Sequence, residues 1–328
     1  MPKHFTAENW WWNGAAVRMN ELAEMNPTTH RSMPDSIVSI GLPVYNGERF
    51  LAQTINSILA QTFSDLELII SDNASVDESR AIAESYARQD NRVRIVQNEV
   101  NKGAAWNYKH VVDLARGRYF RWAPADDLFA PESLACCVEV LDRYSDVVLC
   151  YPKTTLIDAR GEEIAPYEDN LDLRQPNPVE RYKAAIKQMG MMNVIYGLMR
   201  TDVLRQTRLI GNYPGADLIF VAELALFGKF YEIKRRLFFR RLHAGASSSI
   251  QEIQETQAFF DPRTRESVLV PVLKQHLEYL RSIVRGPLAT HEKRALIAFV
   301  LRQLISDRDQ LFREMLFVFA YRKTPRLR

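Results

Sequence analysis

Residues 37–48 read IVSIGLPVYNGE, a β-branched run that ends in a Pro/Asn/Gly turn and is followed at once by a helical pattern. Ile37–Leu42 predicts a buried strand, and Glu48–Gln61 predicts the helix after it. The alternation repeats at intervals of roughly 25 to 30 residues, as parallel βαβ units require. The further expected strands are Leu66–Ser71, Val93–Gln97, Tyr119–Ala123 and Val147–Tyr151, and the further helices are Asp77–Gln89, Ala104–Leu114 and Pro131–Tyr144. We predict an α/β fold with a Rossmann-like, mostly parallel central sheet flanked by helices.

The second half of the chain is less regular. The patterns predict helices over Val179–Gln188 and Pro214–Phe227 and a strand over Tyr231–Phe239. From Phe260 to about Tyr321 the chain is expected to be helical, with an interruption near Gly286-Pro287. Residues 251–328 are therefore predicted to be a C-terminal helical extension. Its last part, Glu292–Tyr321, mixes arginines with apolar residues, so it can either lie on an anionic membrane or pack on its parent domain.

Composition excludes some classes of protein. The 328 residues carry 43 Lys and Arg against 40 Asp and Glu, a balance that argues against nucleic-acid binding. Cys136, Cys137 and Cys150 lack metal-ligand spacing and suit a reducing compartment. No apolar segment precedes Trp10-Trp11-Trp12, and Phe50–Ser64 is too short and too polar to cross a bilayer. We expect a cytoplasmic protein, or one peripheral to the inner face of the membrane, with residues 1–35 as a loosely attached arm.

Polar residues follow the first two expected strands, where parallel sheets bind ligands. Pro43-Val44-Tyr45-Asn46 forms a strand-turn-helix junction, which can offer free backbone N–H groups and a Tyr45 ring for a planar base. Asp72 at the tip of the second strand can accept a hydrogen bond from a base. The plainer alternatives are an ordinary turn at the first position and a helix-capping aspartate at the second.

The third and fourth strands lead into two more polar segments. Asn101-Lys102-Gly103 and the nearby Asn107 lack the Lys-Ser/Thr pair of a P-loop, and no G-x-G-x-x-G follows the first strand. Adjacent Asp126 and Asp127 repel each other unless they are solvated or neutralised. A Mg²⁺ or Mn²⁺ ion shared with a diphosphate would neutralise them, although an Asp-Asp pair can also be a simple turn.

Taken together these motifs resemble a known family. In chain order they are Pro43-Val44-Tyr45-Asn46, Ser71-Asp72-Asn73-Ala74-Ser75, Asn101-Lys102-Gly103 with Asn107, Gly117-Arg118-Tyr119, and Asp126-Asp127 with Pro131. Their order and spacing resemble the inverting family 2 glycosyltransferases with the GT-A fold. The resemblance implies that Asp72 contacts the base, that Asp126 lies near the ribose or phosphates, and that Asp127 binds the metal. It also implies that the nucleotide sugar is contacted by Pro43, Val44, Tyr45, Asn46, Asn101, Gly103 and Asn107.

Two departures and two further segments complete the resemblance. The family often has Asp-x-Asp-Asp where this chain begins with Pro124, which leaves open which carboxylate touches the ion, and it often has Glu-Asp where this chain has Ala216-Asp217. The resemblance makes Asp217 the catalytic base, with Glu223 as the alternative; Asp217 could also serve only the helix dipole. Arg241 and His243 resemble the family's Arg-x-His segment, so Arg241 would contact the diphosphate and His243 would complete the metal shell.

The sequence thus predicts an enzyme with defined parts. Residues 36–250 would be the GT-A domain, divided into a nucleotide-sugar-binding half (36–150) and an acceptor half (151–250). The expected reaction is metal-assisted transfer with inversion from a nucleotide-diphosphate sugar, UDP-sugar favoured, to a saccharide or lipid-linked acceptor. The alternatives are a catalytically silent sugar-nucleotide-binding scaffold and a nucleotidyltransferase that makes the sugar nucleotide.

Overall fold

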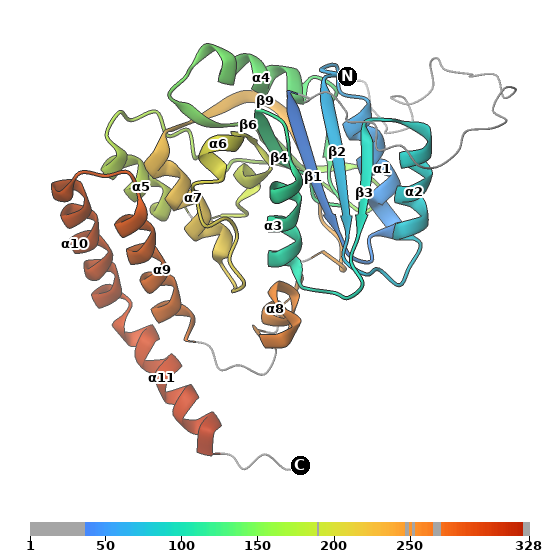
Figure 1. The fold of residues 1–328 in the computed structure, drawn as a ribbon. Helices are drawn as coiled ribbons and strands as arrows, with labels where there is room; N and C mark the ends of the chain where they lie inside the picture. The colour runs from blue at the N-terminus through green and yellow to red at the C-terminus, as the bar shows by residue number, and fades with distance from the viewer. Residues whose placement is uncertain (1–36, 189, 247–248, 251–252, 265–269, 324–328) are drawn as a thin grey trace, which may run out of the picture.

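The structure is a computed structural model that describes residues 37–188, 190–246, 249–250, 253–264 and 270–323. The predicted arm, residues 1–35 with its three tryptophans, lies outside these residues, as does part of the segment after His243. Within the described part, the first half of the chain alternates strands and helices as predicted (Figure 1).

The described strands form one sheet in the order β3-β2-β1-β4-β8-β6-β9-β5, with β7 paired to β6. They are β1 Val38–Val44, β2 Leu66–Asp72, β3 Val93–Gln97, β4 Tyr119–Trp122, β5 Leu128–Phe129, β6 Val147–Ile157, β7 Glu163–Tyr167, β8 Leu198–Arg200 and β9 Lys229–Arg241. The pairs β3-β2, β2-β1, β1-β4 and β6-β9 are parallel, whereas β8 runs antiparallel to both β4 and β6. The parallel βαβ half brings the carboxyl ends of β1, β2 and β4 to one edge.

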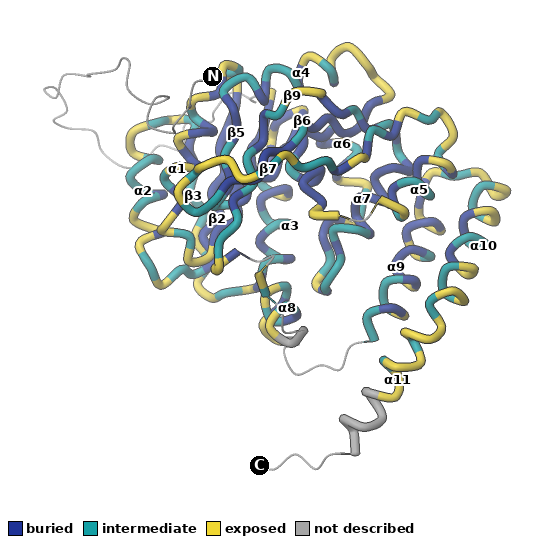
Figure 2. Tube along the Cα trace, turned by 180° about the vertical axis from the view of Figure 1, so that it is seen from behind, coloured by how far each residue is buried: buried dark blue, intermediate teal, exposed yellow. Residues whose placement is uncertain are grey.

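Helices cover both faces of this sheet. They are α1 Glu48–Leu59, α2 Ser79–Gln89, α3 Ala104–Leu114, α4 Ser133–Arg143, α5 Pro178–Lys187, α6 Thr201–Leu204, α7 Ala216–Phe227, α8 Ile253–Phe260, α9 Pro271–Arg285, α10 Thr290–Ser306 and α11 Arg308–Lys323. One apolar core joins β1 and β2 to α1 and α4, and the other joins β4 and β6 to α3, α5 and α7. The central strands β1, β2 and β4 are buried on both sides, and most exposed residues lie on the outer helices, the loops and the edge strand β7 (Figure 2).

Several strand limits differ from the sequence prediction. The strand expected to end at Tyr151 continues to Ile157, and the one expected over Tyr231–Phe239 spans Lys229–Arg241. Thr154 and Thr155 are polar but buried, because β6 pairs along its length with β9. The short strands β5, β7 and β8 were not predicted. β5 and β8 are only two and three residues long and pair with strands that are distant in sequence, so no local pattern marks them; β7 is longer but pairs with the preceding strand β6.

The C-terminal helices pack on the domain at one end and extend from it at the other. The predicted interruption near Gly286 is confirmed, since α9 ends at Arg285 and α10 begins at Thr290. A further break separates α10 from α11. Tyr279 and Ile283 of α9 and Leu296 and Val300 of α10 belong to the same core as α7. None of the described helices is long and apolar enough to cross a membrane.

Candidate active site

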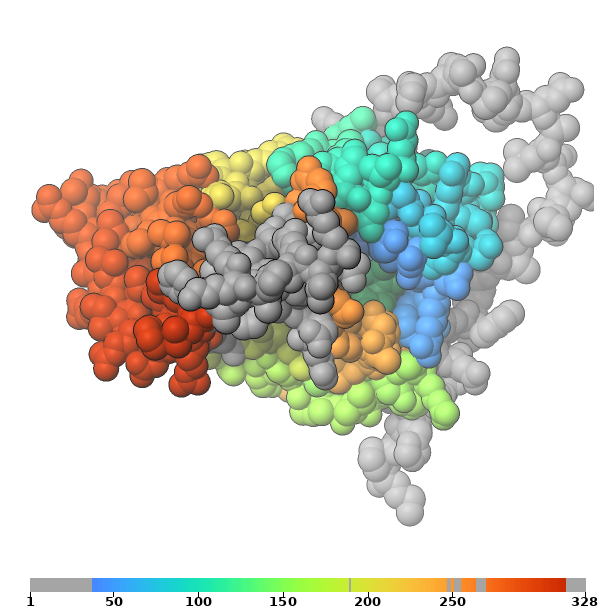
Figure 3. Space-filling model, turned by 90° about the horizontal axis from the view of Figure 1, so that it is seen from below, coloured from blue at the N-terminus to red at the C-terminus, as the bar shows by residue number. Residues whose placement is uncertain are grey.

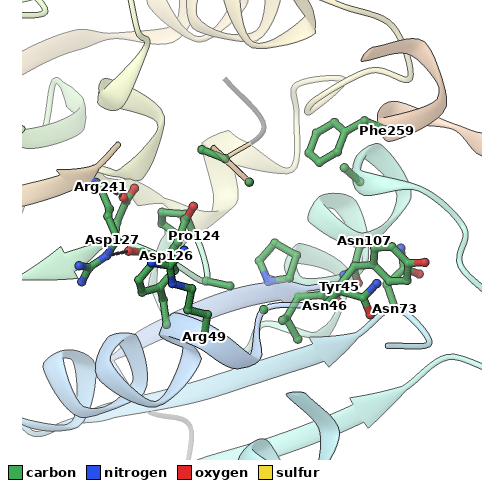
Figure 4. A pocket seen from close by; sticks show the side chains of 18 of the residues that line it. Tyr45, Asn46, Arg49, Asn73, Asn107, Pro124, Asp126, Asp127, Arg241 and Phe259 are labelled. Carbon is green, nitrogen blue, oxygen red and sulfur yellow. Dashed lines mark hydrogen bonds between the residues drawn. The ribbon is translucent and has the colours of Figure 1, made fainter. Parts of the chain in front are cut away.

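A cavity of about 460 Å³ opens at the carboxyl ends of β1 and β4. It is lined by the turn after β1, the start of α1, the loop between β4 and β5, the end of β9, and α8. Seen from below, the C-terminal helices form one flank of the molecule, and the first half of the chain, coloured blue to cyan, forms the other (Figure 3). In close-up, Tyr45, Asn46 and Asn73 lie at one end, Asp126, Asp127 and Arg241 lie at the other, and Phe259 faces them from α8 (Figure 4).

The turn after β1 keeps few backbone donors for a ligand. The N–H of Asn46 donates to Ser75 Oγ at 2.9 Å, that of Gly47 to Ser79 Oγ at 2.7 Å, and that of Glu48 to an Asp77 carboxylate oxygen at 3.0 Å. The expectation of free N–H groups at this junction is therefore wrong, because the loop after β2 caps them. Tyr45 itself lines the cavity and is 48% exposed, so its ring is available to a planar ligand.

Asp72 and Asn73 take different positions at the end of β2. Asp72 is buried, is not among the described lining residues, and accepts a hydrogen bond from the Ser75 N–H at 3.2 Å. Asn73 does line the cavity, and its side chain donates to Asn101 Oδ1 at 2.9 Å. Sequence reasoning missed Asn73, although it is adjacent to the aspartate that was chosen. The base-contacting role of Asp72 stays a prediction.

Asn107 and Gly103 hold the cavity wall together. Asn107 donates to the Ser71 carbonyl at 2.9 Å and lies 3.5 Å from the Val44 carbonyl, so it joins α3 to β2 and β1. Its Oδ1 is buried and has no hydrogen-bond partner in the described part of the chain. Gly103 has φ +87°, and a Cβ there would lie 2.3 Å from the Phe260 carbonyl oxygen. This close approach holds α8, and with it Phe259, at the cavity.

Asp126, Asp127 and His243 converge at the other end. His243 Nε2 lies 2.9 Å from Asp126 Oδ2, and Asp127 Oδ1 accepts a 2.7 Å bond from the backbone N–H of Arg241. Burial, together with the neighbouring charge of Asp126, raises the pKa of Asp127 well above its ordinary value. A ligand that carries positive charge would favour the ionised form of this carboxyl.

The donor chemistry fits a hard divalent cation. Two carboxylates and an imidazole line the same end of the cavity, and oxygen ligands are those that Mg²⁺ and Mn²⁺ prefer. In the described ranges, no three His, Cys, Asp or Glu side chains form a complete metal-ligand group. Asp127, with Asp126 or His243, would therefore hold such an ion through few protein ligands and leave the other positions to phosphate oxygens.

Arg241 lies in a different setting from the one expected. It is 1% exposed, and its guanidinium donates to the Asp126 carbonyl, to Gln53 Oε1, and to the Asp158 carbonyl. These bonds join β9 to the Asp126-Asp127 loop and leave few donors for a diphosphate, although Arg241 borders the cavity. Two other arginines line it, Arg49 and Arg240, and sequence reasoning did not select them.

Asp217 starts α7 and is not among the described residues that line the cavity. Burial raises the pKa of its carboxyl, and the charge of Arg240 opposes that shift. The same arginine acts on Asp127, so it lies within electrostatic reach of both carboxyls. Glu223, the alternative base, is buried and accepts a hydrogen bond from the Arg208 N–H at 3.1 Å. Both base assignments stay predictions, and Asp217 has the closer electrostatic link to the cavity.

The mixed sheet, its two helical layers and the carboxylate-bearing cavity at the strand ends define an α/β protein of the GT-A class. Residues 39–193 match the family model described as glycosyl transferase family 2. Residues 39–193 therefore belong to this family, as their motifs indicated. One relative is an uncharacterized glycosyltransferase, EpsJ of Bacillus subtilis, which is 30% identical over 175 residues, 53% of this chain and 51% of that protein. An uncharacterized glycosyltransferase of Haemophilus influenzae is 26% identical over 227 residues, 67% of this chain and 70% of that protein.

Solved structures share the fold at low sequence identity. Staphylococcus aureus TarS, in complex with UDP-GlcNAc, superposes with a TM-score of 0.60 and 17% identity, over 82% of this chain and 72% of that one. The mannosyltransferase PcManGT of Pyrobaculum calidifontis, in complex with GDP-Man and Mn²⁺, gives a TM-score of 0.52 and 14% identity, over 88% of this chain and 75% of that one. The chain spans about half or less of the length of the first curated relatives that it matches.

Proposed function

We propose that this protein is an inverting glycosyltransferase that moves a sugar from a nucleotide-diphosphate sugar to a hydroxyl of a saccharide or lipid-linked acceptor. The observation that carries the proposal is the cavity at the strand ends, with an aromatic ring at one end and the Asp126-Asp127-His243 group at the other. A nucleotide sugar has matching parts, a planar base and an anionic diphosphate. The complexes of TarS with UDP-GlcNAc and of PcManGT with GDP-Man and Mn²⁺ support it, and a UDP-sugar is the favoured donor for this chain.

The proposed donor contacts follow the length of the cavity. The Tyr45 ring stacks on the base, and Asp72 at the end of β2 is the carboxylate that selects it. Asp126 lies near the ribose or phosphates. Asp127, with His243, holds a Mg²⁺ or Mn²⁺ ion, which when bound stabilises the negative charge of the departing diphosphate.

Asp217 is the proposed catalytic base. Its carboxylate accepts the proton of the acceptor hydroxyl as that oxygen attacks the anomeric carbon and the bond from that carbon to the diphosphate breaks. Displacement from the side opposite the leaving group inverts the anomeric centre. A pKa raised by burial makes Asp217 a stronger base than a solvated aspartate, and the charge of Arg240 stabilises its ionised form.

The last two helices, α10 and α11, indicate where in the cell the enzyme would act. Leu301 and Ile305 of α10 and Phe312, Met315 and Leu316 of α11 are exposed, and Arg302, Arg308 and Arg313 lie among them. Apolar side chains flanked by arginines suit the surface of an anionic membrane. We propose that the protein is cytoplasmic and contacts the inner face of the membrane through this surface, where a lipid-linked acceptor would be available.

The first test is ligand-induced thermal stabilisation with UDP, GDP, CDP and dTDP, each with and without Mn²⁺. Asp127→Asn keeps an acceptor for the Arg241 N–H but removes the charge, and Asp113→Asn on the exposed face of α3 is the control. We expect a Mn²⁺-dependent shift with one nucleotide in wild type and Asp113→Asn, and loss of its metal-dependent part in Asp127→Asn. No shift with any of the four nucleotides would contradict the proposal.

A turnover assay separates the competing functions. A transferase releases the nucleoside diphosphate from its sugar nucleotide, a silent scaffold binds the donor without turnover, and a nucleotidyltransferase releases diphosphate from a nucleoside triphosphate and a sugar phosphate. We expect Asp217→Asn to lower kcat at least a hundredfold while donor affinity stays within about twofold. Unchanged kcat in this variant would reject Asp217 as the base.

A further inference from the structure

Arg49 is a cation at the cavity that forms no ion pair with any residue the structure describes. It is exposed and lines the cavity from the first turn of α1 (Figure 4). Among the described residues its guanidinium makes no hydrogen bond and no ion pair. It lies over the Phe50 ring, with its central carbon 4.8 Å from the ring centroid. Arg241, by contrast, donates to three carbonyls and a side-chain amide oxygen. The donors of Arg49 are therefore free for a ligand.

The position of Arg49 is electrostatically unfavourable for the helix alone. It occupies the second residue of α1, where the positive end of the helix dipole disfavours a cation. At this helix end the backbone N–H groups of Asn46, Gly47 and Glu48 are already bonded to Ser75, Ser79 and Asp77. An anion in this part of the cavity would thus receive its positive partner from a side chain rather than from the backbone.

A second cation lies against the same ring. The guanidinium carbons of Arg49 and Arg241 lie 4.8 Å and 4.5 Å from the Phe50 ring centroid, and the His243 ring centroid is 4.8 Å from it as well. The charge of Arg49 also acts unfavourably on that of Arg241, and a bound anion would relieve this repulsion. Because Arg49 and His243 both contact Phe50, Arg49 lies at the His243 end of the cavity, where a diphosphate and its metal ion are proposed to bind.

The third arginine of the cavity faces elsewhere. Arg240 donates to the Met191 carbonyl and to Asn193 Oδ1, each at 2.6 Å, and its charge acts on Asp217. Arg240 therefore acts on the proposed catalytic base, whereas Arg241 holds the loop between β4 and β5 in place. We infer that Arg49 binds the diphosphate of the donor, the role that sequence reasoning gave to Arg241. This inference rests on the proposed function.

The test compares three ligands on matched variants. Arg49→Gln removes the charge, Arg49→Lys keeps it without the planar guanidinium, and Arg88→Gln on the exposed side of α2 is the control. Affinities for UDP, UMP and uridine are measured by calorimetry in the presence of Mn²⁺, since only the phosphate part differs among these probes. Unfolding temperatures of all variants are compared with wild type to verify folding.

We expect Arg49→Gln to weaken UDP binding at least tenfold and to leave uridine affinity within twofold, with Arg49→Lys between wild type and Arg49→Gln. Arg88→Gln should match wild type for all three probes. Unchanged UDP affinity in Arg49→Gln, or an equal loss for UDP and uridine, would overturn the inference while the proposed function stands. Failure of wild type to bind any of the nucleoside diphosphates of the panel would overturn both.

Discussion

At the scale of single residues, Arg121 and Cys137 form an unusual buried contact. Arg121 of β4 is 1% exposed, and its guanidinium donates to Cys137 Sγ at 3.1 Å and to Ser133 Oγ at 3.2 Å. Arg121 has no carboxylate partner in the described part of the chain. Since a buried arginine stays charged, a Cys137 thiolate is the available counter-charge. Burial alone would raise the pKa of Cys137, but the hydrogen bond from the Cys150 thiol and the charge of Arg121 lower it to about 7.

This pair predicts a specific dependence of stability on pH. Because folding lowers the pKa of Cys137 from its ordinary value of 9.0, its stabilising contribution is complete above pH 9 and is lost as the pH falls through about 7. Cys137→Ser should therefore cost more at pH 9 than at pH 6.5, by about 1 to 3 kcal/mol of unfolding free energy. Urea unfolding at several pH values measures the unfolding free energies of wild type and variant. Cys136→Ser, at the half-buried neighbouring thiol, is the control. If Cys137→Ser lowered the unfolding free energy equally at all pH values, Cys137 would not be a thiolate in the folded protein.

At the scale of elements, the loop after β2 caps the start of α1. Ser79 is fully buried and accepts the Gly47 N–H, whereas the partly exposed Ser75 accepts the Asn46 N–H. Ser79→Ala should lower the unfolding free energy by about 1 to 2 kcal/mol, because a poorly solvated donor loses its acceptor. Ser75→Ala should cost less, since water can replace the hydroxyl. Chemical denaturation of both variants compares them, and equal costs would show that burial does not set the difference.

The contact of Gly103 with α8 provides a second prediction at this scale. Gly103 and Gly215 both have positive φ, +87° and +77°, but only at Gly103 would a Cβ collide with backbone, at the Phe260 carbonyl. Gly215→Ala should cost about 1 kcal/mol from φ strain alone, and Gly103→Ala should cost at least about 1 kcal/mol more. Thermal unfolding gives both values. A similar cost in the two variants would mean that α8 moves away freely.

At the scale of the whole molecule, the C-terminal helices are part of the domain's core. Leu296 of α10 is fully buried in the cluster that contains α7, while Leu301 one turn later is 44% exposed. Leu296→Ala should lower the unfolding free energy by about 2 to 4 kcal/mol, because it leaves a cavity in that core. Leu301→Ala should change it by less than about 1 kcal/mol. Chemical denaturation measures both values. If the two substitutions lowered the unfolding free energy equally, α10 would not pack in the core of the domain.

The exposed surface of α10 and α11 makes the last prediction. Replacing Ile305 and Phe312, which are 61% and 62% exposed, with serine should reduce binding to anionic vesicles at least fivefold without lowering the unfolding temperature. Co-sedimentation with phosphatidylcholine vesicles, with and without phosphatidylglycerol, measures this. Wild type that binds neither kind of vesicle would contradict the membrane contact. Self-association that the same substitutions abolish would assign the surface to a second copy of the chain.

The sequence by itself determined the parallel half of the fold and the family. Buried parallel strands such as Val38–Val44 and the turn at Tyr45-Asn46 have local signatures, because hydrophobic period and turn chemistry act over a few residues. For the same reason Asp126, Asp127 and His243 could be chosen at strand ends, and the structure brings these three to one cavity. The roles assigned to them remain predictions.

Only the tertiary structure decided which side chains are free to meet a ligand. Arg240 and Arg241 are adjacent and chemically identical, yet Arg241 donates to the loop between β4 and β5, whereas Arg240 donates to Met191 and Asn193. Strand β8 and the pairing of β6 with β9 likewise depend on partners more than 40 residues away in sequence. Hydrogen-bond partners, burial and long-range strand pairing arise when distant segments pack together, and no local pattern in the chain records them.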